Sequence, residues 1–354
     1  MKIILQKSFF SEKEKLLLTY GDFSINSFLY QSGVEALRVT NSKMSFIFIP
    51  YKGQQIWHPI VNGTDISMKS TVTEPTASSL YMQTYGGFLY HCGLISMGAP
   101  DAEHPHHGEI PNAIYNSAYI GCGQDKKGKY ILLGGELEHN TAFLRHYKFL
   151  PEIKLYEDGT VFKINVKIEN LRSNPLEYMY LAHINFRRFE GAKVLYSGKC
   201  TSENIRIYEP PTENMDRKLA VFIDEIKNNP EIINEVGTDN EFYDPELCIS
   251  LKYMCDENNR AYTLQYTENG ACYVSHPTDV LSNGIRWTSR TDDDDSMGIV
   301  LPATTDYLNY AGAKQNGKLK IIDGNSSLEF YMEAGWLEPD EAVLVKQKIE
   351  EIVK

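Results

Sequence analysis

The sequence lacks the features that mark disulfide-stapled, membrane-spanning and nucleotide-binding proteins. Its six cysteines show no CxxC pair and no regular spacing over 354 residues. That pattern favours free thiols in a reducing compartment, so we expect a cytoplasmic protein. No apolar run approaches the ~18 residues of a membrane span, and none near the amino terminus is long enough for a signal peptide. Glycine spacings typical of phosphate loops are missing, as is the serine motif GxSxG.

The sequence also has fewer basic than acidic residues. The net charge is −12, and the lysines and arginines are scattered along the chain. This argues against nucleic acid or an anionic membrane as the partner, and it is compatible with a neutral small molecule. The chain is rich in aromatic residues, with 23 Tyr and 15 Phe, which favour β-strands.

The clearest local pattern lies in the middle of the chain. In Val161–Asn170 the even positions from 162 to 168 are apolar and the odd positions from 163 to 169 are polar, which predicts a strand with one solvent-exposed face. Asp158-Gly159 before it is typical of a hairpin turn. The following segment, 177–185, is expected to return as the next strand. Antiparallel hairpins joined by tight turns are therefore the expected building unit.

Helical patterns are few. The carboxy-terminal segment EPDEAVLVKQKIEEIVK predicts an amphipathic helix that begins at Pro339. Residues 201–245 are polar and include the helix candidate KLAVFIDEI, so we expect a loop and helix excursion there. The predicted fold class is all-β and mainly antiparallel, a large β-sandwich or supersandwich with a carboxy-terminal helix, in one domain over residues 1–354.

A polar loop stands out among these apolar segments. HPHHGEIPNA, residues 104–113, holds three histidines and two prolines, which exclude a regular strand or helix interior. We expect a rigid loop that carries polar groups into a sheet-lined cleft. His107 is the favoured functional residue, because Gly108 after it permits close approach of a ligand. The alternative is a polar loop of satisfied histidines. The acids and histidines of 101–109 lack the spacing of a metal site, so we expect no metal and no cofactor.

A second polar site interrupts an apolar strand. In the stretch LAHINF, His183 and Asn185 share one strand face. A histidine titrates near neutrality, so it can accept or donate a proton at physiological pH. The alternative is a core histidine bonded to a neighbour. Trp57 and Trp287 are candidate stacking platforms for a sugar, although isolated tryptophans are more often core residues.

Three short motifs, in this order, resemble the galactose mutarotase (aldose 1-epimerase) superfamily, in its bacterial mutarotase-like branch. They are HHGEIPNA at 106–113, YLAHINF at 180–186 and GIVLPATTDYLNYAGAKQNG at 298–317. The resemblance covers most of the chain and implies a β-supersandwich that binds a monosaccharide in an open cleft. It implies that His183 is the acid at the ring oxygen and that His107 holds a neighbouring sugar oxygen. The expected substrate contacts are Glu109, Asn112, Asn185, Trp57, Arg286, Trp287 and Asp306.

The chemistry that the resemblance implies is interconversion of anomers. A base removes the proton of the anomeric hydroxyl while an acid protonates the ring oxygen, and the ring opens. The sequence departs from the family at Leu301, where a glutamate base normally precedes the proline. Glu109, Glu136 and Asp306 are the candidate replacement bases. The expected function is therefore aldose 1-epimerase activity on an unidentified sugar. The alternative is a non-catalytic sugar-binding or regulatory protein, and a third is another carbohydrate-active enzyme that uses the histidines differently.

Overall fold

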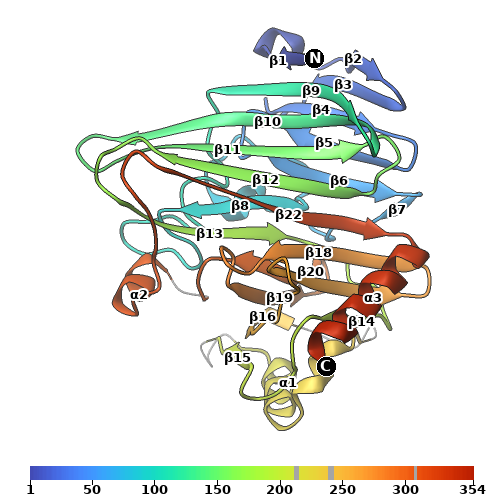
Figure 1. Cartoon of the computed structure of the whole chain (residues 1–354), viewed down its shortest axis with the longest axis vertical. Helices are drawn as coiled ribbons and strands as arrows, with labels where there is room; N and C mark the ends of the chain where they lie inside the picture. The colour runs from blue at the N-terminus through green and yellow to red at the C-terminus, as the bar shows by residue number, and fades with distance from the viewer. Residues whose placement is uncertain (211–214, 238–242, 307–308) are drawn as a thin grey trace.

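Two large antiparallel sheets pack face to face in the computed structural model, which describes residues 1–210, 215–237, 243–306 and 309–354 (Figure 1). The first, sheet A, runs in the order β1 (Lys2–Ile4), β9 (Ser117–Asp125), β10 (Gly128–Thr141), β11 (Arg145–Tyr156), β12 (Val161–Asn170), β22 (Ser327–Leu337), β18 (Gly270–Pro277), β17 (Arg260–Thr267) and β14 (Lys193–Tyr196).

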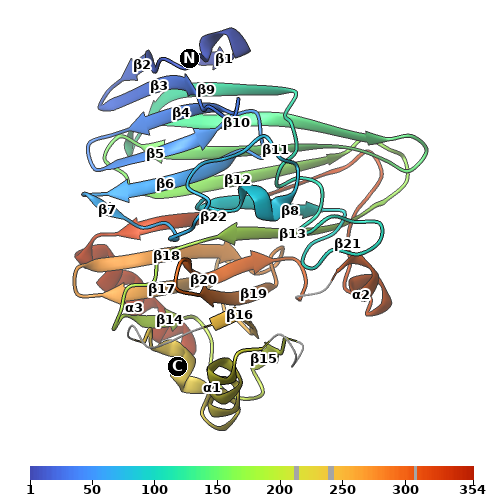
Figure 2. The ribbon, with the colours of Figure 1, turned by 180° about the vertical axis from the view of Figure 1, so that it is seen from behind.

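Sheet B lies behind it and is seen from its own side in Figure 2. Its order is β15 (Ile205–Tyr208), β16 (Tyr243–Leu251), β19 (Asn283–Arg290), β20 (Asp295–Ala303), β13 (Leu176–Ile184), β8 (Leu89–Leu94), β6 (Gln55–Val61), β5 (Met44–Ile49), β4 (Glu35–Thr40), β3 (Phe23–Leu29) and β2 (Lys15–Tyr20). Two short strands join it at the side, β7 (Thr64–Asp65) on β6 and β21 (Lys320–Ile322) on β13.

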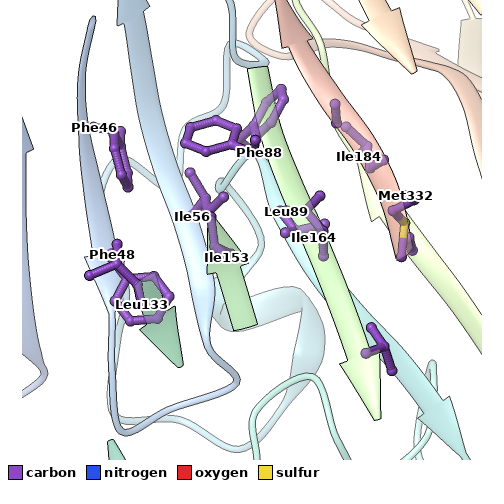
Figure 3. Close-up of a cluster of buried hydrophobic side chains, with 14 of the residues drawn as sticks. Phe46, Phe48, Ile56, Phe88, Leu89, Leu133, Ile153, Ile164, Ile184 and Met332 are labelled. Atoms are coloured by element: carbon purple, nitrogen blue, oxygen red, sulfur yellow. The ribbon is translucent and has the colours of Figure 1, made fainter. Parts of the chain in front are cut away.

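The main core fills the space between the sheets. Figure 3 shows side chains from both sheets meeting there, among them Phe46, Phe88, Ile164, Ile184 and Met332. The alternation in β12 explains its place, because its even positions are buried and its odd positions are half-exposed, as predicted. The fold class is therefore confirmed as a mainly antiparallel β-sandwich.

The connection after β12 differs from the expected hairpin. β12 pairs with β11 and β22 in sheet A, whereas β13 crosses to sheet B and pairs with β8 and β20. The physical reason is burial, because β13 is covered on both faces. Tyr180 and Ile184 pack between the sheets, and Met179 and Leu181 pack on the outer side. The prediction that this segment returns beside β12 was wrong.

Helices lie at the edges of the sandwich. The carboxy-terminal helix α3 (Pro339–Val353) begins at the predicted proline, with Asp340 and Glu341 in its first turn, and packs on β17 and β18 (Figure 1). α1 (Arg217–Asn228) confirms the second predicted helix and packs its apolar face on β16. Among the described residues the remaining helices are α2 (Tyr310–Gln315), η1 (Lys7–Phe9), η2 (Tyr81–Thr84) and η4 (Pro230–Asn234).

All six cysteines are free, as expected, and only Cys255 is exposed. Across the described residues no helix has the length and apolar character to cross a bilayer. The description of the chain as one domain stays a prediction.

Candidate functional site

The two histidine segments are both held by β8. His183 lies near the end of β13, where it pairs with Tyr90 of β8. The loop that carries His107 is bonded to Gly93 of the same strand: the Gly93 N–H donates to the His107 carbonyl at 2.9 Å, and the Ile110 N–H donates to the Gly93 carbonyl at 3.0 Å. One strand therefore fixes the backbone positions of both imidazoles.

Gly108 is required by this close approach of the loop to β8. Its φ is +82°, and a Cβ there would lie 2.2 Å from the carbonyl oxygens of Gly93 and Ser96. The sequence predicts that this glycine admits a ligand, whereas the structure shows that it admits the backbone of Gly93 in β8 and of Ser96 just after that strand. His107 itself has a left-handed φ of 59°. The loop is thus packed against a central strand, and its rigidity stays a prediction.

Hydrogen bonds fix the tautomer of His183. The Asn185 amide donates from Nδ2 to the Gly87 carbonyl at 3.0 Å, so its Oδ1 faces the imidazole. That oxygen lies 2.7 Å from His183 Nδ1, and an oxygen acceptor requires a protonated Nδ1. The Tyr85 hydroxyl donates to the same Oδ1 at 3.0 Å. In the neutral ring, His183 Nε2 is therefore the unprotonated nitrogen.

His107 has the opposite arrangement. The Gly98 N–H donates to His107 Nδ1 at 3.3 Å, so this nitrogen is an acceptor and the neutral ring carries its proton on Nε2. The two rings meet edge to face, with centroids 5.2 Å apart at 86°. The pair therefore combines one imidazole whose Nε2 is unprotonated and lies 3.4 Å from the Tyr85 hydroxyl with another that carries its proton on Nε2.

Burial keeps both rings neutral. His183 is 3% exposed and His107 is 7% exposed. Burial lowers the pKa of His183 to about 3, against a smaller upward effect of the Asn185 hydrogen bond. Burial also holds the pKa of His107 well below its usual range, and the neighbouring His183 and His106 lower it further. Removing an imidazolium from water costs free energy, so neither ring is charged at neutral pH.

Both rings line a cleft on sheet B whose empty space, its open mouth included, is about 490 Å³. The cleft is walled by Tyr81, Met82, Tyr85, His106, His107, Leu181, His183, Glu246, Cys248, Ile285, Trp287 and Leu301. Among these described lining residues there is no lysine or arginine. Aromatic rings surround His183, with Tyr85 at 5.4 Å and Trp287 at 5.1 Å between centroids.

Glu246 is the carboxylate of this cleft, and the sequence analysis did not identify it. It lies on β16, half-buried, and accepts a hydrogen bond from Trp287 Nε1 at 2.5 Å. β16 pairs with β19, which brings Glu246 beside the tryptophan. One feature of the segment YDPELCISL could have pointed to Glu246. Its carboxylate lies two residues before Cys248, and residues two apart in a strand share a face.

Leu301 also faces the cleft, opposite Ile285 in the pairing of β20 with β19. Both side chains are buried, at 2% and 1% exposed. The position where the resemblance implies a glutamate is therefore part of an apolar wall. The carboxylate that the cleft does contain enters from a different strand.

The structure brings some predicted contact residues to the cleft and leaves others outside it. Trp287 lines the cleft. Asn185 is hydrogen-bonded to His183, which lines the cleft. Glu109 and Asn112 line a neighbouring hollow. The Glu109 carboxylate accepts hydrogen bonds from the backbone of Leu94 and Ile95, and a further one from the Tyr147 hydroxyl at 2.5 Å.

Four other predicted residues lie away from the cleft. Trp57 is fully buried in β6 and donates its indole N–H to Gln55 at 2.8 Å. Arg286 points to the opposite face of β19 from Trp287 and binds the Ile233 carbonyl at 2.9 Å. Glu136 pairs with Lys148 at 2.7 Å on sheet A. Asp306 lies 4.0 Å from Arg206 and Lys318. Their side chains do not reach the histidine pair, because strand direction or an ion pair aims them elsewhere.

Nothing in the described part of the chain forms a cluster of three or more metal-ligating side chains suited to an ion. The loop histidines instead have protein partners. His104 Nδ1 lies 2.9 Å from Asp101, and the His106 ring stacks on His107 with centroids 4.4 Å apart.

Comparison with known proteins gives a family and a set of similar folds. Residues 31–335 match the profile of a family described as "Domain of unknown function (DUF4432)". No curated protein sequence matches the chain. A crystal structure described as a "putative aldose 1-epimerase" from Klebsiella pneumoniae superposes with a TM-score of 0.83 at 14% identity, over 100% of this chain and 96% of that one. A galactose mutarotase-like protein from Clostridium acetobutylicum gives 0.58 at 13% identity, over 90% and 100%.

Proposed function

This chain belongs to the DUF4432 family and has a galactose mutarotase-like fold, and on that premise we propose that its cleft binds a neutral aldose and interconverts the anomers. The observation that carries the proposal is the pair of neutral imidazoles of opposite tautomer in one open cleft. One ring accepts a proton at Nε2 and the other donates a hydrogen bond at Nε2. Ring opening of an aldose needs both functions at adjacent oxygens.

His183 acts first as a proton acceptor in this mechanism. Its Nε2 takes the proton from the anomeric hydroxyl while the bond between C1 and the ring oxygen breaks. The His107 Nε2–H stabilises the negative charge that develops on the ring oxygen. The His183 imidazolium then delivers its proton to that oxygen, which completes the open-chain aldehyde. Rotation about C1–C2 and the reverse steps close the other anomer.

His183 therefore protonates the ring oxygen, as the resemblance implies. The proton that it delivers is the one that it takes from the anomeric hydroxyl. A resting imidazolium is disfavoured by burial, because the pKa of His183 is about 3. The anomeric and ring oxygens share one carbon, so a single nitrogen can serve both. Asn185 Oδ1 stabilises the transient cation through Nδ1.

Glu246 and the aromatic walls bind the sugar. The Glu246 carboxylate, held by Trp287, accepts hydrogen bonds from hydroxyl groups, and Tyr85 and Trp287 offer faces for the C–H surface of a pyranose. The lining has no lysine or arginine among the described residues, which supports a neutral sugar over a sugar phosphate.

The test is anomer-exchange NMR over a panel of neutral aldoses with wild type and His183→Gln. Glutamine can hydrogen-bond but cannot carry a proton, so we expect exchange to fall by about 10²–10⁴-fold with little change in sugar affinity. His104→Gln, in the same loop but outside the cleft, is the matched control and should leave exchange unchanged. Exchange at the buffer rate for every sugar with wild type would refute the epimerase proposal.

A second candidate function is sugar binding without catalysis, favoured by the apolar wall of Leu301 and Ile285. It predicts binding of an aldose without acceleration of exchange by the wild type. Leu301→Glu separates the two candidates. Exchange that appears only in this variant would show that the natural protein is a binder on a competent scaffold.

A further inference from the structure

A larger hollow adjoins the cleft on the side of the histidine loop. This outer groove has a volume of about 1280 Å³, its open mouth included, and is formed by residues 79–83 and by the loop from Pro100 to Asn112. It shares Tyr81, Met82 and His106 with the cleft, so the two hollows adjoin at these residues. The Met82 side chain in that wall is 60% exposed, and a flexible thioether adapts readily to a ligand that passes over it.

The groove combines apolar surface with a few amide groups. Leu80 is 61% exposed at its edge, next to Met82, and three prolines give rigid apolar walls. Gln83 and Asn112 supply amides on the same surface. Such a lining suits a pyranose, which has C–H faces and a rim of hydroxyl groups.

The groove is held in place before any ligand arrives. Gln55 Nε2 donates to Asn112 Oδ1 at 3.0 Å, and Asn112 Nδ2 donates to the Ser79 carbonyl at 3.4 Å. The buried Lys52 ammonium donates to the Thr76 and Ser78 carbonyls and so anchors the segment that leads into the groove. A preformed surface loses little conformational freedom when it binds.

We propose that the ligand of this protein is a neutral reducing disaccharide or a longer reducing saccharide. Its reducing-end unit occupies the cleft, and its next unit crosses Met82 and His106 into the outer groove. This inference rests on the proposed function and names the substrate class for it. Glu109 in the groove and Glu246 in the cleft are the charged lining residues, apart from the histidines, within the described chain, so both units are uncharged or at least not anionic.

The linkage follows from the chemistry. Anomer exchange needs a free hydroxyl on C1 of the unit in the cleft. The second unit must therefore be joined to another hydroxyl of that sugar, and a glycoside blocked at C1 can bind but cannot be exchanged.

The experiment compares three neutral reducing disaccharides, maltose, cellobiose and lactose, with glucose, their common reducing-end unit. Affinity is measured by calorimetry and exchange by NMR. The test variant is Leu80→Trp, which fills the groove from an exposed position without touching the cleft. The matched control is Leu144→Trp, where the leucine is 65% exposed in the turn between β10 and β11 and lines neither hollow.

We expect at least one disaccharide to bind tenfold or more tightly than glucose. Leu80→Trp should reduce that affinity to about the level of glucose and leave glucose binding unchanged, whereas Leu144→Trp should change neither. Glucose binding that depends on His183, with no gain from any disaccharide, would overturn this inference alone. An equal loss of glucose and disaccharide affinity in Leu80→Trp would also overturn it. If neither class of sugar binds, the proposed function falls as well.

Discussion

Buried histidines make the folded protein sensitive to acid. His91, His183 and His276 each have a pKa of about 3, lowered from 6.5 by burial. Between these two values the unfolded chain binds protons that the folded chain does not, so stability falls as the pH drops below about 6.5. Each histidine removes up to about 1.4 kcal/mol per pH unit, and the three together up to about 4 kcal/mol per unit. Domains are typically stable by about 5–15 kcal/mol, so we expect unfolding between about pH 5 and about pH 3.

His276 offers the sharpest test because neither ring nitrogen has a hydrogen-bond partner among the described residues. His276→Leu should reduce the slope of unfolding free energy against pH by about 1.4 kcal/mol per unit below pH 6. Val274→Ala, buried on the same strand, should lower stability equally at all pH values. The measurement is urea unfolding followed by tryptophan fluorescence from pH 8 to 5. An unchanged slope in His276→Leu would refute the reasoning.

Three further predictions address the site and its scaffold. Because the pKa of His183 is about 3, anomer exchange should be constant between pH 7 and 5; a tenfold rise per unit as the pH falls would show that a resting imidazolium is required. Gly108→Ala should lower the unfolding free energy by at least about 2 kcal/mol and weaken sugar binding, because the methyl group meets the carbonyls of Gly93 and Ser96; normal denaturation and binding curves would contradict the proposed close approach. Lys348→Met removes the ammonium 2.5 Å from the buried Asp256 carboxylate and should cost about 1–3 kcal/mol in thermal or urea unfolding; hydrogen exchange in α3 that stays unchanged would contradict this role.

The sequence predicted the strand and the helix whose apolar residues repeat with a regular period. The alternation of Val161–Asn170 and the amphipathic segment from Pro339 each describe one wet face and one buried face, and the structure confirms both elements. The step from β12 to β13 was not predictable in the same way. A turn at Ser173-Asn174-Pro175 looks the same whether the next strand returns beside its neighbour or crosses to the other sheet.

The site was predictable where one short segment carried its own geometry. His183 and Asn185 share a strand face, and they are indeed hydrogen-bonded. Glu246 was missed because its place depends on the pairing of β16 with β19, which no local pattern reveals. Arg286 and Trp287 could have been separated, since neighbouring residues of a strand point to opposite faces and only one can enter a given cleft.

The attachment of both imidazoles to β8 has a consequence for how this protein can change. The backbone positions of the two rings are set by main-chain hydrogen bonds to β8, which require Gly108 but no particular side chain in the cleft walls. Residues in the walls, such as Ile285, Leu301 and Cys248, are therefore open to replacement without altering those positions. A laboratory search for new ligand preferences should accordingly vary the walls and leave β8 and the loop it holds untouched.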